Sequence, residues 1–161
     1  MPSNTATMGR RCNRLVALTG LSLLVGCSSY EAKWKAAADR PVSADSIEGP
    51  WEGTWASDAD GHAGGLRCVL TRTGPDTYQA DYHATYWKVF GFGYSMPLRA
   101  AQREGQQVVF EGAADLGWLA GGDYHYEGQA DPAEFFCEYR SKYDFGTFRM
   151  QRPEETMKSE R

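Results

Sequence analysis

The stretch GLRCVLTRTGPDTYQADYHAT, residues 65–85, decides the fold class of this chain. Apolar and polar residues alternate on both sides of Gly74-Pro75-Asp76, which is a sequence typical of a tight turn. Side chains two apart on a β-strand share one face, so each half of the stretch presents an apolar face and a polar face. We therefore predict two antiparallel strands joined by a short loop.

Similar alternating segments, rich in aromatic and β-branched residues, fill the chain between Gly49 and Pro153. They are separated by Gly, Pro and Asp at intervals of about ten residues, as in all-β domains, and no long helical period interrupts them. The eight predicted strands are Trp51 to Ser57, Gly65 to Thr73, Thr77 to Thr85, Val89 to Leu98, Gln107 to Gly112, Asp123 to Ala130, Glu134 to Ser141, and Gly146 to Arg152. Closing them into a small antiparallel up-and-down barrel removes the exposed sheet edges that invite aggregation.

Gly53-Thr54-Trp55, in the first predicted strand, resembles the Gly-x-Trp motif of the calycin barrels, the group that contains lipocalins and avidins. The resemblance implies that Trp55 packs near the barrel floor against an arginine of the last strand, either Arg149 or Arg152. The predicted barrel is short for a lipocalin, so we do not expect the large lipocalin cavity. An uncharacterised family of small barrel lipoproteins is the alternative that this resemblance leaves open.

The inward face of the predicted barrel is bulky and aromatic, because the apolar members of each segment point the same way. Such side chains can fill a narrow eight-strand barrel, which predicts a packed core. Inward tyrosine hydroxyls must still find hydrogen-bond partners, and a small polar ligand would supply them, so a ligand pocket remains the alternative. The side chains expected to line it are Trp55, Tyr78, Tyr82, Tyr124 and Tyr126.

Residues 10–27 resemble the export signal of bacterial lipoproteins. A basic segment and an uncharged stretch too short to span a bilayer lead to Leu24-Val25-Gly26-Cys27, which matches the lipobox at all four positions. The resemblance implies cleavage between Gly26 and Cys27, and attachment to Cys27 of a diacylglyceryl thioether and an amide-linked acyl chain such as palmitate. Two or more acyl chains anchor a protein durably. Ser28, in place of the aspartate common in similar inner-membrane lipoproteins, favours the outer membrane.

The chain is expected to have four parts. They are a cleaved signal peptide (1–26), a lipidated cysteine with a flexible tether (27–48), the β-barrel (49–153) and a disordered tail (154–161). Within the polar, alanine-rich tether we expect only a short helical turn, at Glu31 to Ala38. Translation could start at Met1 or at Met8, since either leaves a complete signal.

The charge balance excludes one class of partner. The chain contains 17 Lys and Arg against 21 Asp and Glu, and three of the arginines lie in the signal, so the mature domain has a net charge of −7. Nucleic acid and anionic lipid both favour clustered basic residues, and none are clustered here. We therefore expect no nucleic-acid partner, and we expect the membrane to be reached through the covalent lipid on Cys27.

The four cysteines have different expected fates. Cys12 leaves with the signal and Cys27 carries the lipid, which leaves Cys68 and Cys137 as a pair in an oxidising compartment. Both lie on the predicted inner face, so a disulfide would join the second strand to the seventh. Two buried free thiols that act as small hydrophobes are the alternative.

Residues 116–122, Leu-Gly-Trp-Leu-Ala-Gly-Gly, form an apolar loop with flexible hinges, whereas loops are normally polar because they face water. One prediction is that Trp118 and Leu119 fold inward and close one end of the barrel. The other is that they form an exposed patch that binds a protein partner or lies on the membrane.

Catalytic chemistry has little support in the sequence. Asp58-Ala59-Asp60-Gly61-His62 lacks the downstream glutamate of a calcium loop and predicts a turn. No nucleophile elbow, phosphate loop or metal-ligand spacing occurs, so we predict no catalytic residue, metal or cofactor. We expect a non-catalytic ligand-binding or structural module of the bacterial envelope, with a small ligand or an envelope protein as its unidentified partner. A protein-recognition barrel, either an inhibitor or an assembly factor, is the alternative, and an enzyme using Asp58, Asp60 and His62 is the least favoured class.

Overall fold

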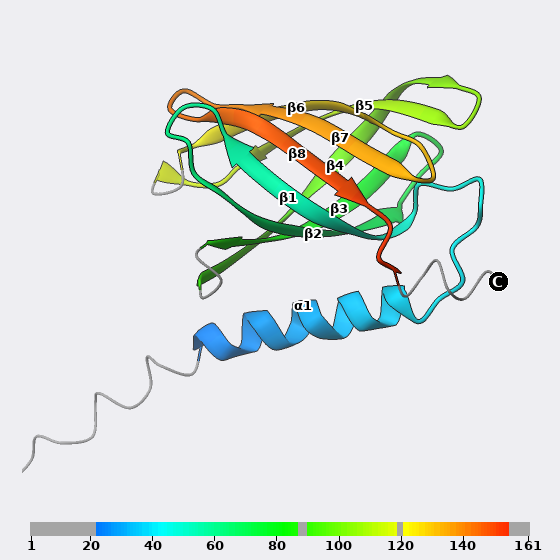
Figure 1. The fold of residues 1–161 in the computed structure, drawn as a ribbon, viewed down its shortest axis with the longest axis horizontal. Helices are drawn as coiled ribbons and strands as arrows, with labels where there is room; N and C mark the ends of the chain where they lie inside the picture. Colours follow the sequence, from blue (N-terminus) through cyan, green and yellow to red (C-terminus); the bar gives the residue numbers. More distant parts are fainter. Residues whose placement is uncertain (1–21, 87–89, 119–120, 155–161) are drawn as a thin grey trace, which may run out of the picture.

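The computed structural model describes residues 22–86, 90–118 and 121–154 and contains a helix followed by eight antiparallel strands (Figure 1). The helix is α1 (Ser22–Ala38), and the strands are β1 (Gly49–Ser57), β2 (Ala63–Arg72), β3 (Thr77–Tyr86), β4 (Phe90–Glu104), β5 (Gln107–Asp115), β6 (Asp123–Ala130), β7 (Glu134–Arg140) and β8 (Phe145–Gln151). Each strand pairs with its sequence neighbours, and β8 also pairs with β1, which closes the barrel. The predicted all-β up-and-down barrel is therefore confirmed.

The seam between the first and last strands explains the glycine of the Gly-x-Trp motif. Gly53 lies opposite Met150 in the antiparallel pair of β1 and β8. A Cβ atom built on Gly53 would lie 2.0 Å from the carbonyl oxygen of Arg149, so only glycine lets the two backbones approach this closely. The motif marks the position where the barrel closes.

One strand differs clearly from its predicted length. We expected the fourth strand to end at Leu98, but β4 continues to Glu104. The pairing of β4 with β5 shifts register between Ala100 and Gln102, which indicates a bulge. A bulge lets a strand bend and continue, and the alternation of apolar residues does not reveal it because the bulge breaks that alternation.

The barrel interior is packed over most of its length. On β2, the side chains of Leu66, Cys68 and Leu70 are almost completely buried, as the alternation predicts. The same inward parity holds on other strands, where the fully buried side chains include Trp51, Tyr82, Met96, Leu98, Phe110, Tyr126, Phe135 and Cys137. The prediction of a bulky aromatic interior is confirmed.

The two ends of the barrel differ, and one of them is closed by the chain that leads into β1. Ile47 and Trp51 are buried there, and the indole Nε1 of Trp51 donates a hydrogen bond of 2.9 Å to the carbonyl oxygen of Ile47. We call this the closed end. The open end is the one at which β1, β3, β5 and β7 finish, on the left in Figure 1.

An arginine completes the closed end. The guanidinium of Arg152 lies 3.9 Å from the ring centroid of Trp51 and is almost fully buried. It donates hydrogen bonds to four carbonyl oxygens, those of Ser46, Glu48, Pro50 and Pro132. One side chain thereby ties the segment before β1 to the end of β8 and to the turn after β6.

The predicted tryptophan–arginine pair therefore involves a different tryptophan. The calycin resemblance implied that Trp55 packs against Arg149 or Arg152, but Trp51 holds that position and Trp55 lies toward the open end, where it contacts Tyr86. Arg149 lies outside the barrel, 4.7 Å from the ring of Phe136. Trp51 and Trp55 share the inward parity of β1, so the motif alone could not distinguish them.

Helix α1 occupies the first part of residues 27–48, the segment for which we predict a flexible tether. It runs from Ser22 to Ala38, well beyond the predicted turn, and lies along β2 and β3 (Figure 1). Lys33 donates to Asp81 across 2.8 Å, Glu31 pairs with Arg67, and the ring of Tyr30 stacks 4.9 Å from that of His83. Because these partners lie on distant strands, the composition of the segment could not reveal them. Among the described residues, no helix has both the length and the apolar character needed to cross a membrane.

Two further predictions concern the chain ends. Met1, Met8 and Cys12 lie outside the described residues, as does the predicted tail beyond Glu154. Gly26 and Cys27 lie within α1, so helical backbone continues across the predicted cleavage point.

Candidate functional site

The open end of the barrel contains a cavity of about 210 Å³, which we call the aromatic cup. The residues that line it are Trp55, Ala84, Tyr86, Phe92, Tyr94, Leu116, Tyr124, Tyr126, Tyr139, Asp144 and Phe148. They come from β1, β3, β4, β6, β7 and β8 and from the loops that follow β5 and β7. The cup exists because inward side chains at this end stop short of filling the barrel, whereas Trp51 and Arg152 fill the other end.

The aromatic rings that form the wall of the cup pair with one another in two groups, Trp55 with Tyr86 and the remaining rings around Tyr126 and Tyr139. Trp55 and Tyr86 have ring centroids 4.4 Å apart, and Tyr139 and Phe148 have centroids 5.0 Å apart. Tyr124 lies 5.9 Å from Tyr139. These separations lie in the range in which tilted and offset aromatic pairs attract, so the wall is formed before any ligand arrives.

Three of the five side chains predicted to line a ligand pocket line this cavity. Trp55, Tyr124 and Tyr126 line the cup. Tyr78 does not, because it lies opposite Arg72 and Leu98 toward the closed end.

Tyr82 does not line the cup either, because it is buried in the packed core below it, where its ring stacks on Tyr94 at 5.1 Å. The barrel therefore has a packed core in its closed half and a cavity in its open half.

Sequence reasoning missed Tyr86, Phe92, Tyr94, Tyr139 and Phe148 as lining residues. A usable signal was present for three of them, since Tyr86, Tyr139 and Phe148 share the inward parity already recognised on their strands. What the sequence could not supply is the direction of each strand relative to the open end, which separates cup residues from core residues on the same face. Tyr86 lies at the boundary that lacked any turn residue.

The phenol groups of the cup are neutral at pH 7. Burial raises the pKa of Tyr94, Tyr126 and Tyr139. The Tyr126 hydroxyl donates to the Tyr94 hydroxyl across 3.3 Å. Phenols held in this way provide uncharged aromatic faces and polar edges to a ligand.

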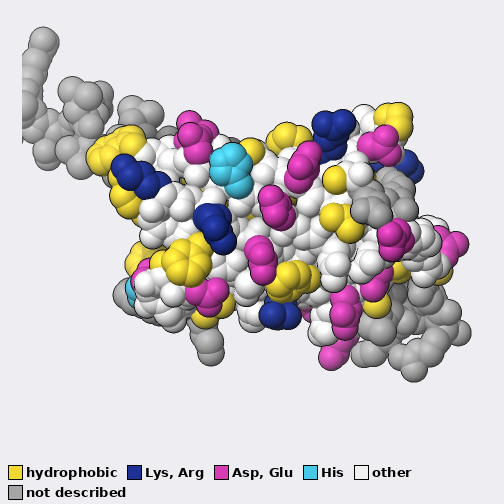
Figure 2. Space-filling model, turned by 90° about the horizontal axis from the view of Figure 1, so that it is seen from above, with side chains coloured by type: hydrophobic (Ala, Val, Ile, Leu, Met, Phe, Trp, Pro, Cys, Tyr) yellow, Lys and Arg dark blue, Asp and Glu magenta, His cyan; other side chains and the backbone are white. Residues whose placement is uncertain are grey.

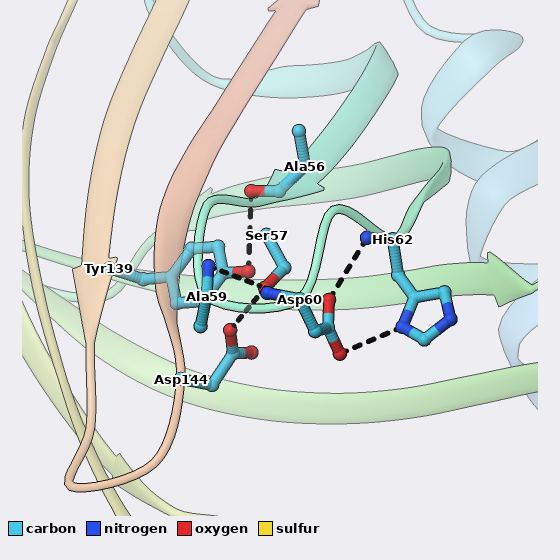
Figure 3. Close-up of polar contacts among 7 residues, drawn as sticks. All are labelled: Ala56, Ser57, Ala59, Asp60, His62, Tyr139 and Asp144. Carbon is cyan, nitrogen blue, oxygen red and sulfur yellow. Dashed lines mark hydrogen bonds and ion pairs between the residues drawn. The ribbon is translucent and has the colours of Figure 1, made fainter.

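The cup has one carboxylate at its edge. Ser57 Oγ donates a hydrogen bond of 2.6 Å to Asp144 Oδ1 (Figure 3), and the Asp144 backbone N–H donates to Ser141 Oγ across 3.0 Å. Beside this pair, the Tyr139 hydroxyl donates to the carbonyl oxygen of Ala56. Asp144 is thus held by Ser57 at the end of β1 and by Ser141 just after β7.

The predicted turn at residues 58–62 is confirmed. Ser57 caps it by accepting hydrogen bonds at Oγ from the backbone N–H groups of Ala59 and Asp60 (Figure 3). The His62 backbone N–H donates to Asp60, which lowers the pKa of that carboxyl to about 2, and the His62 ring lies 2.7 Å from the same carboxyl. Within the described part of the chain, no group of three or more acidic, His or Cys side chains could hold a metal ion.

Exposed aromatic side chains surround the mouth of the cup. They are Tyr86, Phe90, Phe92, Trp118, Tyr143 and Phe145, which we call the rim. Each lies in or beside a connection after β3, β5 or β7. Figure 2 shows hydrophobic side chains gathered at the left-hand end of the molecule, which is the open end, with acidic side chains scattered along the face.

The prediction that Trp118 folds inward is wrong. Its side chain is 86% exposed, so it cannot close the barrel end. Positive φ angles at Gly117, Gly121 and Gly122 direct the loop outward, and few residues other than glycine adopt these angles. Leu116 alone of the apolar loop residues lines the cup, and Leu119 lies outside the described residues.

The predicted disulfide is absent. Cys68 and Cys137 are free and completely buried, which corresponds to the alternative of two small hydrophobic side chains. Their strands, β2 and β7, are not neighbours in the sheet, because β1 and β8 lie between them. Burial raises the pKa of both thiols, so neither is a nucleophile at neutral pH.

No family model, curated protein or solved structure matches this chain.

Proposed function

We propose that this protein is a lipid-anchored, non-catalytic binding module of the bacterial envelope and that the aromatic cup is its ligand site. The observation that carries the proposal is the cup itself: a preformed cavity of about 210 Å³ in a barrel that is otherwise packed. Ligand sites are concave, mostly apolar and equipped with a few polar groups, and this cavity has all three properties. An engineered apolar cavity of about 150 Å³ binds benzene, so the cup is large enough for a small molecule.

The chemistry of the lining favours binding over catalysis. The phenols are neutral at pH 7, and the carboxyl of Asp144 is occupied in a hydrogen bond that holds a turn. A proton-transfer catalyst needs a group whose pKa lies near the working pH, and raised phenol pKa values do not provide one. Contacts with a bound molecule require only the faces and edges that the rings present.

The position of α1 supports attachment to a membrane beside the mouth of the cup. Ser29 and Tyr30 line a groove together with Gly91 and Phe92, at the open-end side of β4. Cys27 precedes Ser29 by two residues, or about 3 Å of helix rise, so acyl chains on Cys27 would start near the rim. We propose that the lipid holds the open end toward the membrane, with the outer membrane favoured by Ser28.

Protein recognition is the second candidate function, because Trp118 is exposed at the tip of a glycine-hinged loop. Exposed tryptophans are frequent anchors of protein interfaces. In that case the protein would act as an inhibitor or an assembly factor, and the cup residues would only support the loop that carries Trp118.

Native mass spectrometry of the full chain, exported in a bacterial host and extracted from membranes, tests the proposal. We expect a chain that begins at Cys27, carries diacylglyceryl and acyl mass, and binds a small non-covalent molecule that denaturation releases. Ala84→Phe places a ring inside the cup and should abolish the adduct. Ala113→Phe, which adds the same ring to an exposed site on β5, is the matched control and should leave it unchanged.

Three results would count against the proposal. A chain without acyl mass would remove the anchor. An adduct that persists in Ala84→Phe would place the ligand elsewhere. A protein partner that co-purifies with the wild type and is lost with Trp118→Ser, but not with Ala84→Phe, would favour protein recognition.

A further inference from the structure

Aromatic rings line the aromatic cup from its entrance down to its base. Phe92 and Tyr94 stack with centroids 5.8 Å apart on β4, and Tyr126 lies 6.0 Å from Phe148 across the barrel. Tyr86 and Phe92 are about 40% exposed and form the entrance, whereas Tyr126 is buried below them. A molecule in the cup would therefore be surrounded by ring faces and edges on most sides.

The charge of the cup has a single sign. Asp144 is the one charged side chain among the described residues that line it. Its carboxylate also acts on the phenols, because, after burial, the negative charge of Asp144 raises the pKa of Tyr86 and Tyr139. Lys142, the nearest cation in sequence, lies over the ring of Tyr143 at 5.0 Å, and neither residue lines the cup. The electrostatic potential inside the cup therefore favours a cation.

A hydrophobic cation is the ligand that matches both properties. Aromatic faces within about 6 Å attract ammonium groups through their quadrupoles, and the attraction increases when water is excluded. Metal ions and guanidinium groups need several oxygen partners, whereas a methylated ammonium needs mainly ring faces and one nearby negative charge. Its bulk is comparable to that of benzene, which a cavity of about 150 Å³ accepts, so the cup of about 210 Å³ has room for it.

We infer that the aromatic cup binds an organic ammonium ion of the trimethylammonium type, with the cation enclosed by Tyr86, Phe92, Tyr124, Tyr126, Tyr139 and Phe148 and balanced by Asp144. This inference rests on the proposed function, since it names the ligand class of the same site. The ammonium group could belong to a free solute or to the headgroup of a lipid, because both present the same chemistry at the mouth.

The test compares choline with 3,3-dimethylbutan-1-ol, in which a carbon atom replaces the charged nitrogen and the shape is kept. Ligand-observed NMR titrations would use the full chain extracted in dodecyl maltoside, a detergent without an ammonium group. We expect choline to bind at least tenfold more tightly than its neutral isostere. Asp144→Asn keeps an oxygen for the Ser57 hydrogen bond and should reduce that ratio at least fivefold.

The matched control is Asp115→Asn, which removes a carboxylate from the same end of the barrel without changing the lining of the cup. It should leave the ratio within twofold of the wild type. Phosphatidylcholine vesicles that compete with free choline would identify a lipid headgroup as the source, and vesicles that do not compete would identify a solute.

Three outcomes count against the inference, and they differ in what they leave standing. Equal binding of choline and the isostere would show a cup that selects shape without charge, so the ammonium inference would fail and the binding function would remain. Absence of binding by both probes, with the barrel still folded, would refute the ammonium inference and leave the cup without a ligand of this size. A ratio that falls equally in Asp144→Asn and Asp115→Asn would refute the role of Asp144.

Discussion

Removing the guanidinium at the closed end should destabilise the barrel strongly, and Arg152→Met is the variant that tests this. Arg152 is almost fully buried, donates hydrogen bonds to four carbonyl oxygens and lies against Trp51. A hydrogen bond from a charged group contributes about 1.5–3 kcal/mol, and a desolvated cation–π contact adds about 2 kcal/mol. These contributions are not additive, because the carbonyl groups regain water and methionine restores packing, so we expect a loss of about 4 kcal/mol.

Urea denaturation followed by far-UV circular dichroism measures this loss. A single domain is stable by about 5–15 kcal/mol, so Arg152→Met should still fold with a much lower midpoint. Arg152→Lys retains the charge but loses the planar fork, and we expect it to lose about 2–3 kcal/mol. Arg149→Met is the control, because Arg149 lies on the same strand but outside the barrel over Phe136.

The reasoning would be refuted if Arg152→Met cost less than about 1 kcal/mol, or if Arg149→Met cost as much as Arg152→Met. Either result would mean that Arg152 does not stabilise the closed end of the barrel.

Three further predictions concern the seam, the tyrosines and the thiols. Gly53→Ala should destabilise the barrel by about 3 kcal/mol or more in urea denaturation, because the added Cβ would overlap the backbone of β8. The control is Thr54→Ala at the neighbouring exposed position, which should change stability little. Similar urea midpoints for the two variants would contradict the close approach of β1 and β8. Burial raises the pKa of seven tyrosines above their pKa in the unfolded chain, which is about 10. The stability that they contribute is therefore complete below pH 10 and is lost as the pH rises further, by about 1.4 kcal/mol per pH unit for each fully buried tyrosine. A urea midpoint that does not change from pH 8 to 11 would be inconsistent with this. Cys68 and Cys137 should resist thiol reagents in the folded protein and both react after unfolding without reductant; a need for reductant would reveal a disulfide.

The sequence predicted the barrel well because strand parity is a local property. Leu66, Cys68 and Leu70 occupy every second position between Gly65 and Thr71, so their shared face is visible within seven residues, and all three are buried. Val69 is also buried although it lies on the opposite face, which the alternation does not predict. Turn residues marked most strand ends for the same reason. The bulge in β4 and the end of β3 at Tyr86 were harder, because neither has a turn residue to mark it.

The cup and its surroundings were predicted less completely, because they depend on contacts between distant segments. Trp51 and Trp55 have the same parity and similar neighbours, yet the one packs against Arg152 and the other lines the cup. Helix α1 is held by side chains on β2 and β3 that no local pattern connects to it. The outward direction of Trp118 follows from the φ angles of its glycines, which composition does not specify.

Hydroxyl-radical footprinting of the full chain, with and without choline, tests the central claim that the open end of the barrel is a preformed ligand site. We predict that oxidation of Tyr86 and Phe92 at the entrance falls when choline is present, while Trp118, which lies outside the cup, reacts rapidly in both samples. Slow oxidation of Trp118 without choline, or unchanged oxidation of Tyr86 and Phe92 with saturating choline, would contradict the account.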